Sequence, residues 1–256
     1  MAVHLIALDG TEHRDGPWVP SAHRTLEAID AMVGELAAAA LANDPETVVA
    51  VVSDHGFIAT HTAVNLRVPF VAAGLIELAA EPTVGVAPTI ADWQAQLWPS
   101  GGSAAVVLRD RGDAVLRARV AKLLDELRAE SANGIARVLT RAEIERAGAP
   151  PDAEFVIEFA PGYYAGTALQ GELRTPASSK GTHGYLPERP EMHASFFMKG
   201  RRIVAREVGI IDMRQIAPTF AAVLGVELPH AGARAVAIPR DAVANPRDDS
   251  LLSRKE

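Results

Sequence analysis

The chain has 256 residues, of which 48% are hydrophobic, and a net charge of −7 at pH 7. This is typical of a globular protein with one large domain or a core with an insertion. The negative charge and the lack of a basic stripe argue against a nucleic-acid binder that depends on charge. There is no cysteine, so any metal must be held by His, Asp or Glu.

The N-terminus begins with a short apolar run. Residues 3–8 predict a core strand of the parallel type, because the run is too short and lacks the basic region of a signal peptide. No stretch reaches the 18 or so apolar residues that a membrane helix needs, so we expect no membrane span. A core strand in this position leads us to expect that a further segment precedes it.

The first chemical motif follows this predicted strand. Asp9 and His13 form the pattern D-x3-H, and Gly10 and Gly16 allow the backbone to turn tightly around them. If the loop makes one turn, positions i and i+4 meet on one side. A polar loop without a ligand has the same composition, so this motif alone decides nothing.

The next elements complete a predicted βαβ unit. Residues 21–41 carry apolar side chains at helical spacing and predict a helix. Residues 47–52 form an apolar run rich in β-branched side chains, which predicts a buried strand. Residues 1–52 therefore predict strand, helix and strand with a right-handed crossover.

An acid and an imidazole, Asp54 and His55, follow the second predicted strand directly. In open α/β sheets, ligands bind outside the carboxyl ends of the strands. A carboxylate oxygen with an imidazole nitrogen suits a divalent metal such as zinc. The alternative is an Asp that caps the next turn beside a hydrogen-bonded His. Two predicted strands are each followed by an acid and an imidazole, and this repetition favours a metal site over a capped turn.

The stretch 62–177 predicts an inserted α+β cap domain that contains no cluster of His or carboxylate ligands. Its aromatic side chains would either line a substrate cleft or belong to the core of the cap. The residue pattern predicts strands over 104–108, 135–139 and 154–159, a helix over 113–130, and a small helix opened by a capping box from Thr140 to Glu143.

The core is predicted to resume near residue 178, where His183 lies between glycines in G-T-H-G-Y. It is the third ligand candidate, although a His in such a loop is often merely exposed. Residues 192–198 predict a strand, with His193 as a packed imidazole at its start.

The C-terminal part predicts one helix and a tail. Residues 201–211 suggest a strand or hairpin, and Asp212 predicts the N-cap of a helix over 213–224 that Gly225 ends. The polar residues 241–256 are expected to fray.

These motifs, in this order, resemble the type I phosphodiesterase / nucleotide pyrophosphatase branch of the alkaline phosphatase superfamily. The resemblance covers most of the chain. It rests on D-x3-H with R-x-G-P (Asp9 to Pro17), S-D-H-G-F (Ser53–Phe57), Asn65-Leu66 followed by Ala73-Gly74-Leu75-Ile76, G-T-H-G-Y followed by M-H-A, and I-D-M-x-x-I-A-P-T with L-G-V-x-L-P (Ile211–Pro229).

The resemblance implies an α/β fold, a three-layer αβα sandwich with a mostly parallel central sheet. Residues 1–61 and 178–256 would form the metal-binding core, and 62–177 the inserted cap. It also implies two metal ions, usually zinc. Asp9, His13 and His183 would hold the first, and Asp54 and His55 the second together with a further Asp and a nucleophilic Thr or Ser. Such a pair of metals stabilises both oxygens of an in-line displacement.

The sequence departs from the family at the nucleophile. In the family, the further Asp and the nucleophile belong to a long section that precedes D-x3-H. Ser53 lies inside a ligand motif and Thr11 lies between Asp9 and His13, so neither is assigned as nucleophile. We therefore expect a missing N-terminal segment, upstream or on a separate chain.

Two hypotheses follow for the function. The first is a metal-dependent hydrolase of small-molecule phosphate esters, of the phosphodiesterase or nucleotide pyrophosphatase type. The second is a catalytically inactive metal-binding remnant with a single metal. Other branches of the superfamily stay open within the first hypothesis: phosphomonoesterases, sulfatases, phosphonoacetate hydrolases and metal-dependent phosphomutases.

Overall fold

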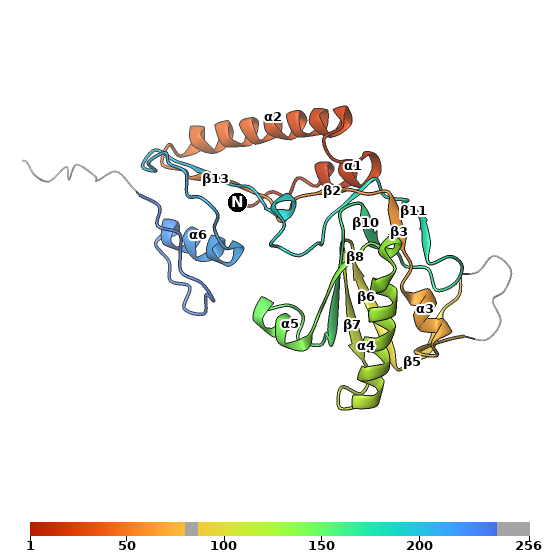
Figure 1. Cartoon of the computed structure of the whole chain (residues 1–256). Coiled ribbons are helices and arrows are strands. Elements are labelled where there is room, and N and C mark those ends of the chain that lie inside the picture. Colours follow the sequence, from red (N-terminus) through yellow and green to blue (C-terminus); the bar gives the residue numbers. More distant parts are fainter. Residues whose placement is uncertain (80–86, 240–256) are drawn as a thin grey trace, which may run out of the picture. The chain divides into compact units, whose positions relative to one another are not determined.

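The computed structural model describes residues 1–79 and 87–239 as a mixed α/β structure (Figure 1). The chain divides into two compact units. The first contains Met1–Val33 and Ser53–Ser195, and the second contains Gly34–Val52 and Phe196–Glu256. In the described part, no helix is long and apolar enough to cross a membrane. The tail predicted at 241–256 lies outside the described residues.

A four-stranded antiparallel sheet forms the largest part of the first unit, with the strand order β6-β7-β9-β8. All five residues of β9 are buried, as expected for a strand with a neighbour on each side. The strands predicted at 104–108, 135–139 and 154–159 are confirmed. The four are β6 (Ala95–Ser100), β7 (Ser103–Leu108), β8 (Ile135–Leu139) and β9 (Phe155–Phe159).

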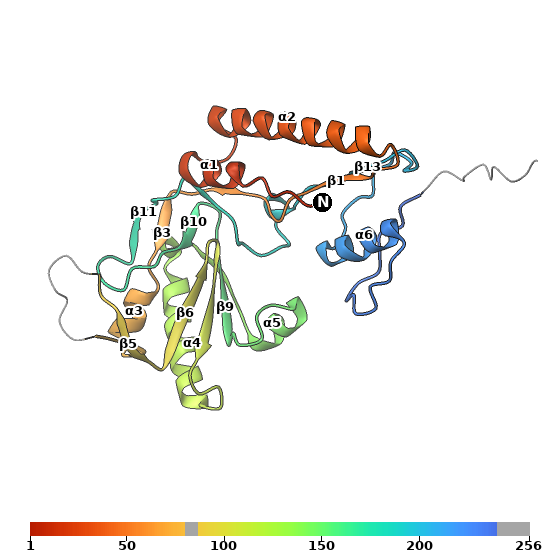
Figure 2. The ribbon, with the colours of Figure 1, turned by 180° about the vertical axis from the view of Figure 1, so that it is seen from behind.

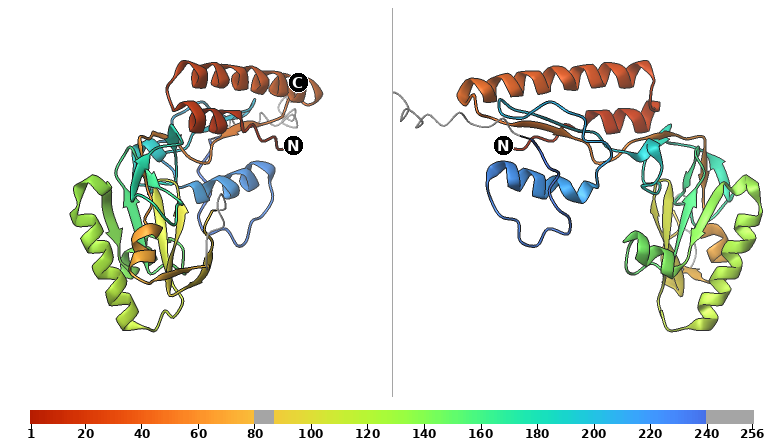
Figure 3. Two further views of the ribbon diagram at one scale, coloured as in Figure 1. Left: turned by 90° about the vertical axis from the view of Figure 1, so that its right-hand side faces the viewer. Right: turned by 60° about the vertical axis from the view of Figure 1, so that its left-hand side comes forward.

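Helix α4 (Ala114–Ala129) lies along one face of this sheet, in front of the strands in Figure 1 and behind them in Figure 2. Figure 3 shows the same arrangement from two further sides. The buried residues of α4 recur every three or four positions, which confirms the predicted amphipathic helix. Asp113 caps it by accepting a 2.8 Å hydrogen bond from the backbone N–H of Leu116.

The short helix α5 (Arg141–Ala147) begins with the predicted capping box. The backbone N–H of Thr140 donates to Oε2 of Glu143 at 2.7 Å. The helix ends at Gly148, whose φ of +64° is a left-handed conformation that glycine adopts without strain.

The hydrophobic core of the first unit joins this sheet to α4 and to the segments around it. Full burial of one such side chain contributes about 1.5–3 kcal/mol. The largest side chains that are almost completely buried include Val64, Phe70, Leu97, Val106, Val120, Ile157 and Phe159.

Shorter elements surround the sheet. Strand β3 lies between β10, with which it is parallel, and β11, with which it is antiparallel. Strand β2 pairs with β12, and β4 pairs with β5. Their bounds are β2 (Ile58–Ala59), β3 (Thr62–Val64), α3 (Arg67–Ala72), β4 (Ile76–Leu78), β5 (Ile90–Trp93), β10 (Tyr163–Ala165), β11 (Arg174–Pro176) and β12 (Gly181–Thr182).

The second unit contains a two-stranded ribbon, helix α6 and the part of α2 (Pro20–Asn43) that begins at Gly34. Strand β1 (Val49–Val52) pairs antiparallel with β13 (Phe196–Lys199). Helix α6 (Ile216–Leu224) follows a short 3-10 turn (Met213–Gln215) that Asp212 caps, and it ends at Gly225 as predicted. The strand or hairpin predicted at 201–211 is wrong, because these residues form no strand.

The strand predicted at residues 3–8 is also wrong, since helix α1 (Ala7–Asp15) occupies part of it. Val3 and Ile6 are 51% and 66% exposed. A strand needs a neighbour to satisfy its backbone groups, and no described strand pairs with these residues. The helix instead has an acidic residue in its first turn and basic residues in its last turn, which suits the helix dipole.

The predicted βαβ unit is therefore absent. Helix α2 (Pro20–Asn43) confirms the helix at 21–41, and β1 confirms a strand within 47–52. The prediction that this strand is buried is wrong, because three of the four residues of β1 are exposed, and β1 is antiparallel to its partner. Among the pairings in the described residues, only β10 with β3 is parallel. The mostly parallel central sheet expected from the sequence is not found there.

Candidate metal centre

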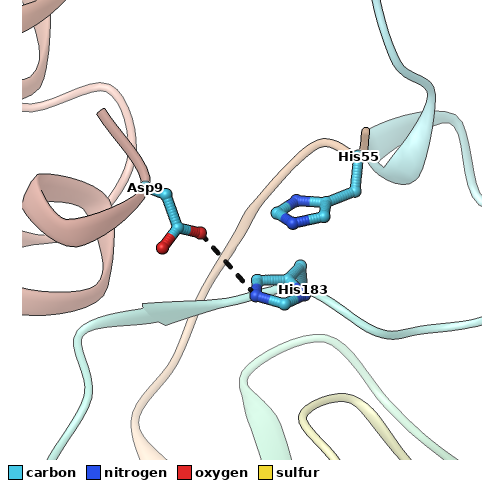
Figure 4. A group of neighbouring side chains, drawn as sticks. All are labelled: Asp9, His55 and His183. Atoms are coloured by element: carbon cyan, nitrogen blue, oxygen red, sulfur yellow. Dashed lines mark ion pairs between the residues drawn. The ribbon is translucent and has the colours of Figure 1, made fainter. Parts of the chain in front are cut away.

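Three separate segments of the first unit bring an acid and two imidazoles together (Figure 4). Asp9 belongs to α1, His55 follows β1, and His183 follows β12. One ligand atom from each residue lies within 4.8 Å of the other two. Oδ1 of Asp9 lies 3.7 Å from Nε2 of His183.

His13 lies one helical turn after Asp9. Its Nε2 is 3.6 Å from the same Oδ1 of Asp9. The spacing D-x3-H brings the two side chains together as predicted, but on a helix and not in a loop after a strand. His13 is therefore beside the three grouped residues, and its ring centre is 5.1 Å from that of His183.

Hydrogen bonds orient two of the imidazoles. Nδ1 of His13 lies 2.9 Å from the carbonyl oxygen of Gly181, and Nδ1 of His55 lies 3.1 Å from that of Gly56. A carbonyl oxygen only accepts, so each Nδ1 carries the proton and each Nε2 keeps a lone pair. This arrangement is typical of histidines that bind a metal through Nε2.

The imidazoles of His55 and His183 stack. Their centroids are 3.7 Å apart and their planes are inclined by 14°. Burial lowers the pKa of His183, and the neighbouring imidazoles of His55 and His13 lower it further. A lowered pKa favours the neutral imidazole, which is the form that binds metal ions.

Asp54 lies at the edge of this group. Its Oδ2 is 3.4 Å from Nε2 of His55, and its side chain is 81% exposed. All five predicted ligand candidates therefore lie in one region of the first unit. The resemblance groups Asp9 and His183 with His13, whereas the three residues whose ligand atoms all lie within 4.8 Å of one another include His55.

Sequence reasoning missed the loop that holds α1 in place. The backbone N–H of Lys180 donates to the carbonyl of His13 at 2.8 Å, and Oγ of Ser179 is 3.0 Å from the same oxygen. A Cβ at Gly181 would lie 2.8 Å from the carbonyl oxygen of Glu12. Only glycine permits this close approach. The polar, glycine-containing sequence S-S-K-G was the feature from which this loop could have been predicted.

A glycine pair supports the backbone of His183. The backbone N–H of Gly102 donates to the carbonyl of His183 at 2.8 Å. Gly101 has a φ of +62°, and a Cβ there would lie 2.2 Å from the same oxygen. The hairpin turn between β6 and β7 thus holds the third ligand candidate in position.

Glu12 is a further carboxyl that the sequence analysis did not single out. It lies on α1 between the two candidates of D-x3-H. Burial raises its pKa, and the nearby negative charge of Asp9 raises it further. Its position beside the candidates is a consequence of the helical conformation of this segment.

The hydroxyl groups of Thr11 and Ser53, which lie next to ligand candidates in the sequence, form hydrogen bonds to the backbone. Thr11 is 7% exposed, and its Oγ1 donates to the carbonyl of Ala7 at 2.9 Å. Oγ of Ser53 accepts a 2.8 Å hydrogen bond from the backbone N–H of Ser195. Neither geometry indicates a nucleophile at the candidate site.

The donor set fits a divalent ion such as zinc, since it combines one carboxylate with two imidazoles. In a tetrahedral site with bonds near 2.0–2.1 Å, neighbouring ligand atoms are about 3.4 Å apart. The 3.7 Å between Asp9 and His183 is close to this value.

Residues 1–186 match the model of the family described as type I phosphodiesterase / nucleotide pyrophosphatase. The chain belongs to this family. Together with the fold likeness below, this places it in the alkaline phosphatase superfamily. The family is typically dependent on divalent metals. No curated protein sequence matches the chain.

Solved structures of relatives have a similar fold. Murine ectonucleotide pyrophosphatase / phosphodiesterase 5 is 19% identical with a TM-score of 0.59, and the human protein is 18% identical with a TM-score of 0.58. An inactive murine variant in complex with AMP is 20% identical with a TM-score of 0.60. In each comparison, 88% of this chain aligns with 54% of the other, so this family member spans about half the length of these relatives.

Proposed function

We propose that this chain provides the metal-binding residues of a phosphate-ester hydrolase of the phosphodiesterase or nucleotide pyrophosphatase type. The observation that carries the proposal is the group formed by Asp9, His55 and His183, whose ligand atoms lie within 4.8 Å of one another. Membership of the phosphodiesterase family supports the reaction type.

The proposed roles follow from the positions of the side chains. Asp9, His55 and His183 hold a divalent ion, which we propose to be zinc from the mixture of oxygen and nitrogen donors. His13 and Asp54 lie next to them and would complete this site or a second one. The carbonyls of Gly181 and Gly56 keep the protons of His13 and His55 on Nδ1, so that Nε2 is available. When bound, the ion would polarise the phosphoryl oxygens of the ester.

The substrate is proposed to be a small phosphate ester of a nucleoside. This rests on the AMP complex of the murine relative, whose fold is similar. The inserted cap at 62–177 is likewise a proposal. The cap is supported by the four-stranded sheet with α4 and α5, all drawn from the interval between residues 95 and 159.

The second candidate function is a metal-binding remnant without catalysis. The observation in its favour is that the hydroxyls of Thr11 and Ser53 form hydrogen bonds away from the ligand candidates. Covalent catalysis needs an activated nucleophile, so a chain without one would hydrolyse esters orders of magnitude more slowly.

Two measurements on the purified chain test these proposals. Zinc content should be about one ion per chain, and His183→Ala should abolish tight binding while His23→Ala, on the exposed surface of α2, should not. Zinc-free protein under saturating conditions would rule out the metal site. Turnover of bis(p-nitrophenyl) phosphate separates the two functions, since robust metal-dependent hydrolysis by this chain excludes the remnant.

A further inference from the structure

One aromatic ring contacts all three imidazoles of the candidate metal centre. The centroid of Phe57 lies 4.9 Å from that of His13, 5.8 Å from that of His55 and 5.4 Å from that of His183. The interplanar angles of 74°, 55° and 69° describe T-shaped or tilted contacts, which aromatic pairs prefer.

Phe57 is itself fixed by the backbone around it. It directly precedes β2, whose Ile58 pairs with Thr182 of β12, the residue before His183. A Cβ at Gly181 would lie 3.2 Å from Cδ1 of Phe57 and 2.8 Å from Cδ of Pro17. The ring of Phe57 therefore lies directly beside Gly181 of β12.

His183 depends most on these ring contacts. Within residues 1–79 and 87–239 its imidazole makes no hydrogen bond, in contrast to the rings of His13 and His55. Besides its 3.7 Å contact with Oδ1 of Asp9, it is located by the stack on His55 and by contacts with the rings of His13 and Phe57.

We propose that Phe57 is a positioning residue that holds the imidazoles of His13, His55 and His183 in their metal-binding orientation. The proposal rests on the proposed metal site. Phe57 takes no part in coordination, because it carries no donor atom. Metal-binding histidines are usually oriented by a hydrogen-bond acceptor. For His183, the ring of Phe57 has this orienting role.

The test compares zinc affinity, measured by competition with a chromophoric chelator, among matched variants. Phe57→Leu keeps an apolar side chain but removes the flat ring, and should weaken zinc binding about 10–100-fold, as loss of an orienting contact to a ligand does. Phe57→Tyr keeps the ring and should restore affinity close to that of the wild type. Phe70→Leu, in the core of the same unit, is the control for a structural effect and should leave affinity unchanged.

The Co²⁺ absorption spectrum adds a readout of ligand geometry. It should change in Phe57→Leu and stay as in the wild type in Phe70→Leu. Equal zinc affinity and an unchanged Co²⁺ spectrum in Phe57→Leu would overturn the proposal. So would a loss of affinity in Phe70→Leu as large as that in Phe57→Leu, because the effect would then reflect general destabilisation.

A metal-free measurement separates this proposal from the proposed function. NMR of the wild-type apoprotein should show NOEs between the ring protons of Phe57 and those of all three imidazoles. If the wild type binds no metal, the proposed function fails, and the NOEs alone decide whether Phe57 positions the rings. Absence of these NOEs overturns the positioning role even if Phe57→Leu does not fold.

Discussion

Nε2 of His183 and Oδ1 of Asp9 lie 3.7 Å apart, although one residue follows β12 and the other belongs to α1. Two features of the backbone bring them together. Gly181 allows β12 to approach the carbonyl of Glu12 on α1, and the turn at Gly101 holds the carbonyl of His183. The candidate metal centre therefore depends on glycines that carry no chemistry of their own.

The carboxylate of Asp9 should be required for metal affinity. Asp9→Asn keeps the size of the side chain but removes its negative charge. The three nearby imidazoles supply no negative charge to replace it, so zinc affinity should fall by about 100-fold or more. Isothermal titration calorimetry with zinc measures this. Asp15→Asn, at the end of the same helix and paired with Arg14, is the control and should bind zinc as the wild type does. Unchanged affinity in Asp9→Asn would remove Asp9 from the site.

The buried carboxylate of Glu158 should stabilise the four-stranded sheet. It is 4% exposed, and its two oxygens accept hydrogen bonds from Nε of Arg137 at 2.9 Å and from Nε of Arg189 at 2.7 Å. Glu158→Gln removes the negative charge and replaces one accepting oxygen by an NH2 group that cannot accept, so one of the two bonds is lost. The free energy of unfolding should fall by about 1.5–3 kcal/mol.

Chemical denaturation of Glu158→Gln and of a matched control measures this difference. Glu145→Gln breaks an exposed i, i+4 pair with Arg141 and should cost less than about 0.5 kcal/mol. Equal losses in the two variants would contradict the special role of the buried pair.

Removal of the side chain of Ile157 tests the core. Ile157 is completely buried in β9, so Ile157→Ala should lower the free energy of unfolding by about 2–5 kcal/mol through lost burial and an unfilled cavity. Val115 on α4 is 73% exposed, so Val115→Ala should change the free energy of unfolding by no more than about 0.5 kcal/mol. A small effect of Ile157→Ala in thermal or denaturant unfolding would show that β9 is not central to the core.

Tyr185 should make the stability of the fold sensitive to alkaline pH. Burial raises the pKa of its phenol from 10 to about 12, and its hydroxyl donates to the carbonyl of Tyr163 at 2.7 Å. Because the pKa in the folded state is above that in the unfolded state, the contribution is complete below pH 10 and is lost as the pH rises to about 12.

Unfolding curves at increasing pH measure this loss. In Tyr185→Phe the decline between pH 10 and 12 should be smaller than in the wild type, because no phenol is left to ionise at this position. A decline of the same size in both proteins would assign the pH dependence to other groups.

The sequence by itself determined the elements that depend on local pattern. The helices α2 and α4 and the strands β7 to β9 follow from apolar spacing. The capping box of α5, the Asp212 cap before α6 and the end of α6 at Gly225 follow from side chains and a glycine that suit the nearby backbone. The sequence also indicated the family and the five candidate side chains, because both are recognised from short motifs and their order along the chain.

Only the tertiary structure decided how these parts pair. An apolar run at residues 3–8 looks like a strand, but a strand forms only where another strand accepts its backbone hydrogen bonds, and here α1 forms instead. His55 lies with Asp9 and His183 because segments far apart in the chain come together. The contacts of Phe57 with three imidazoles depend on the same segments. Spacing along a sequence records which side chains are present, whereas their convergence depends on close backbone approaches that no local pattern encodes.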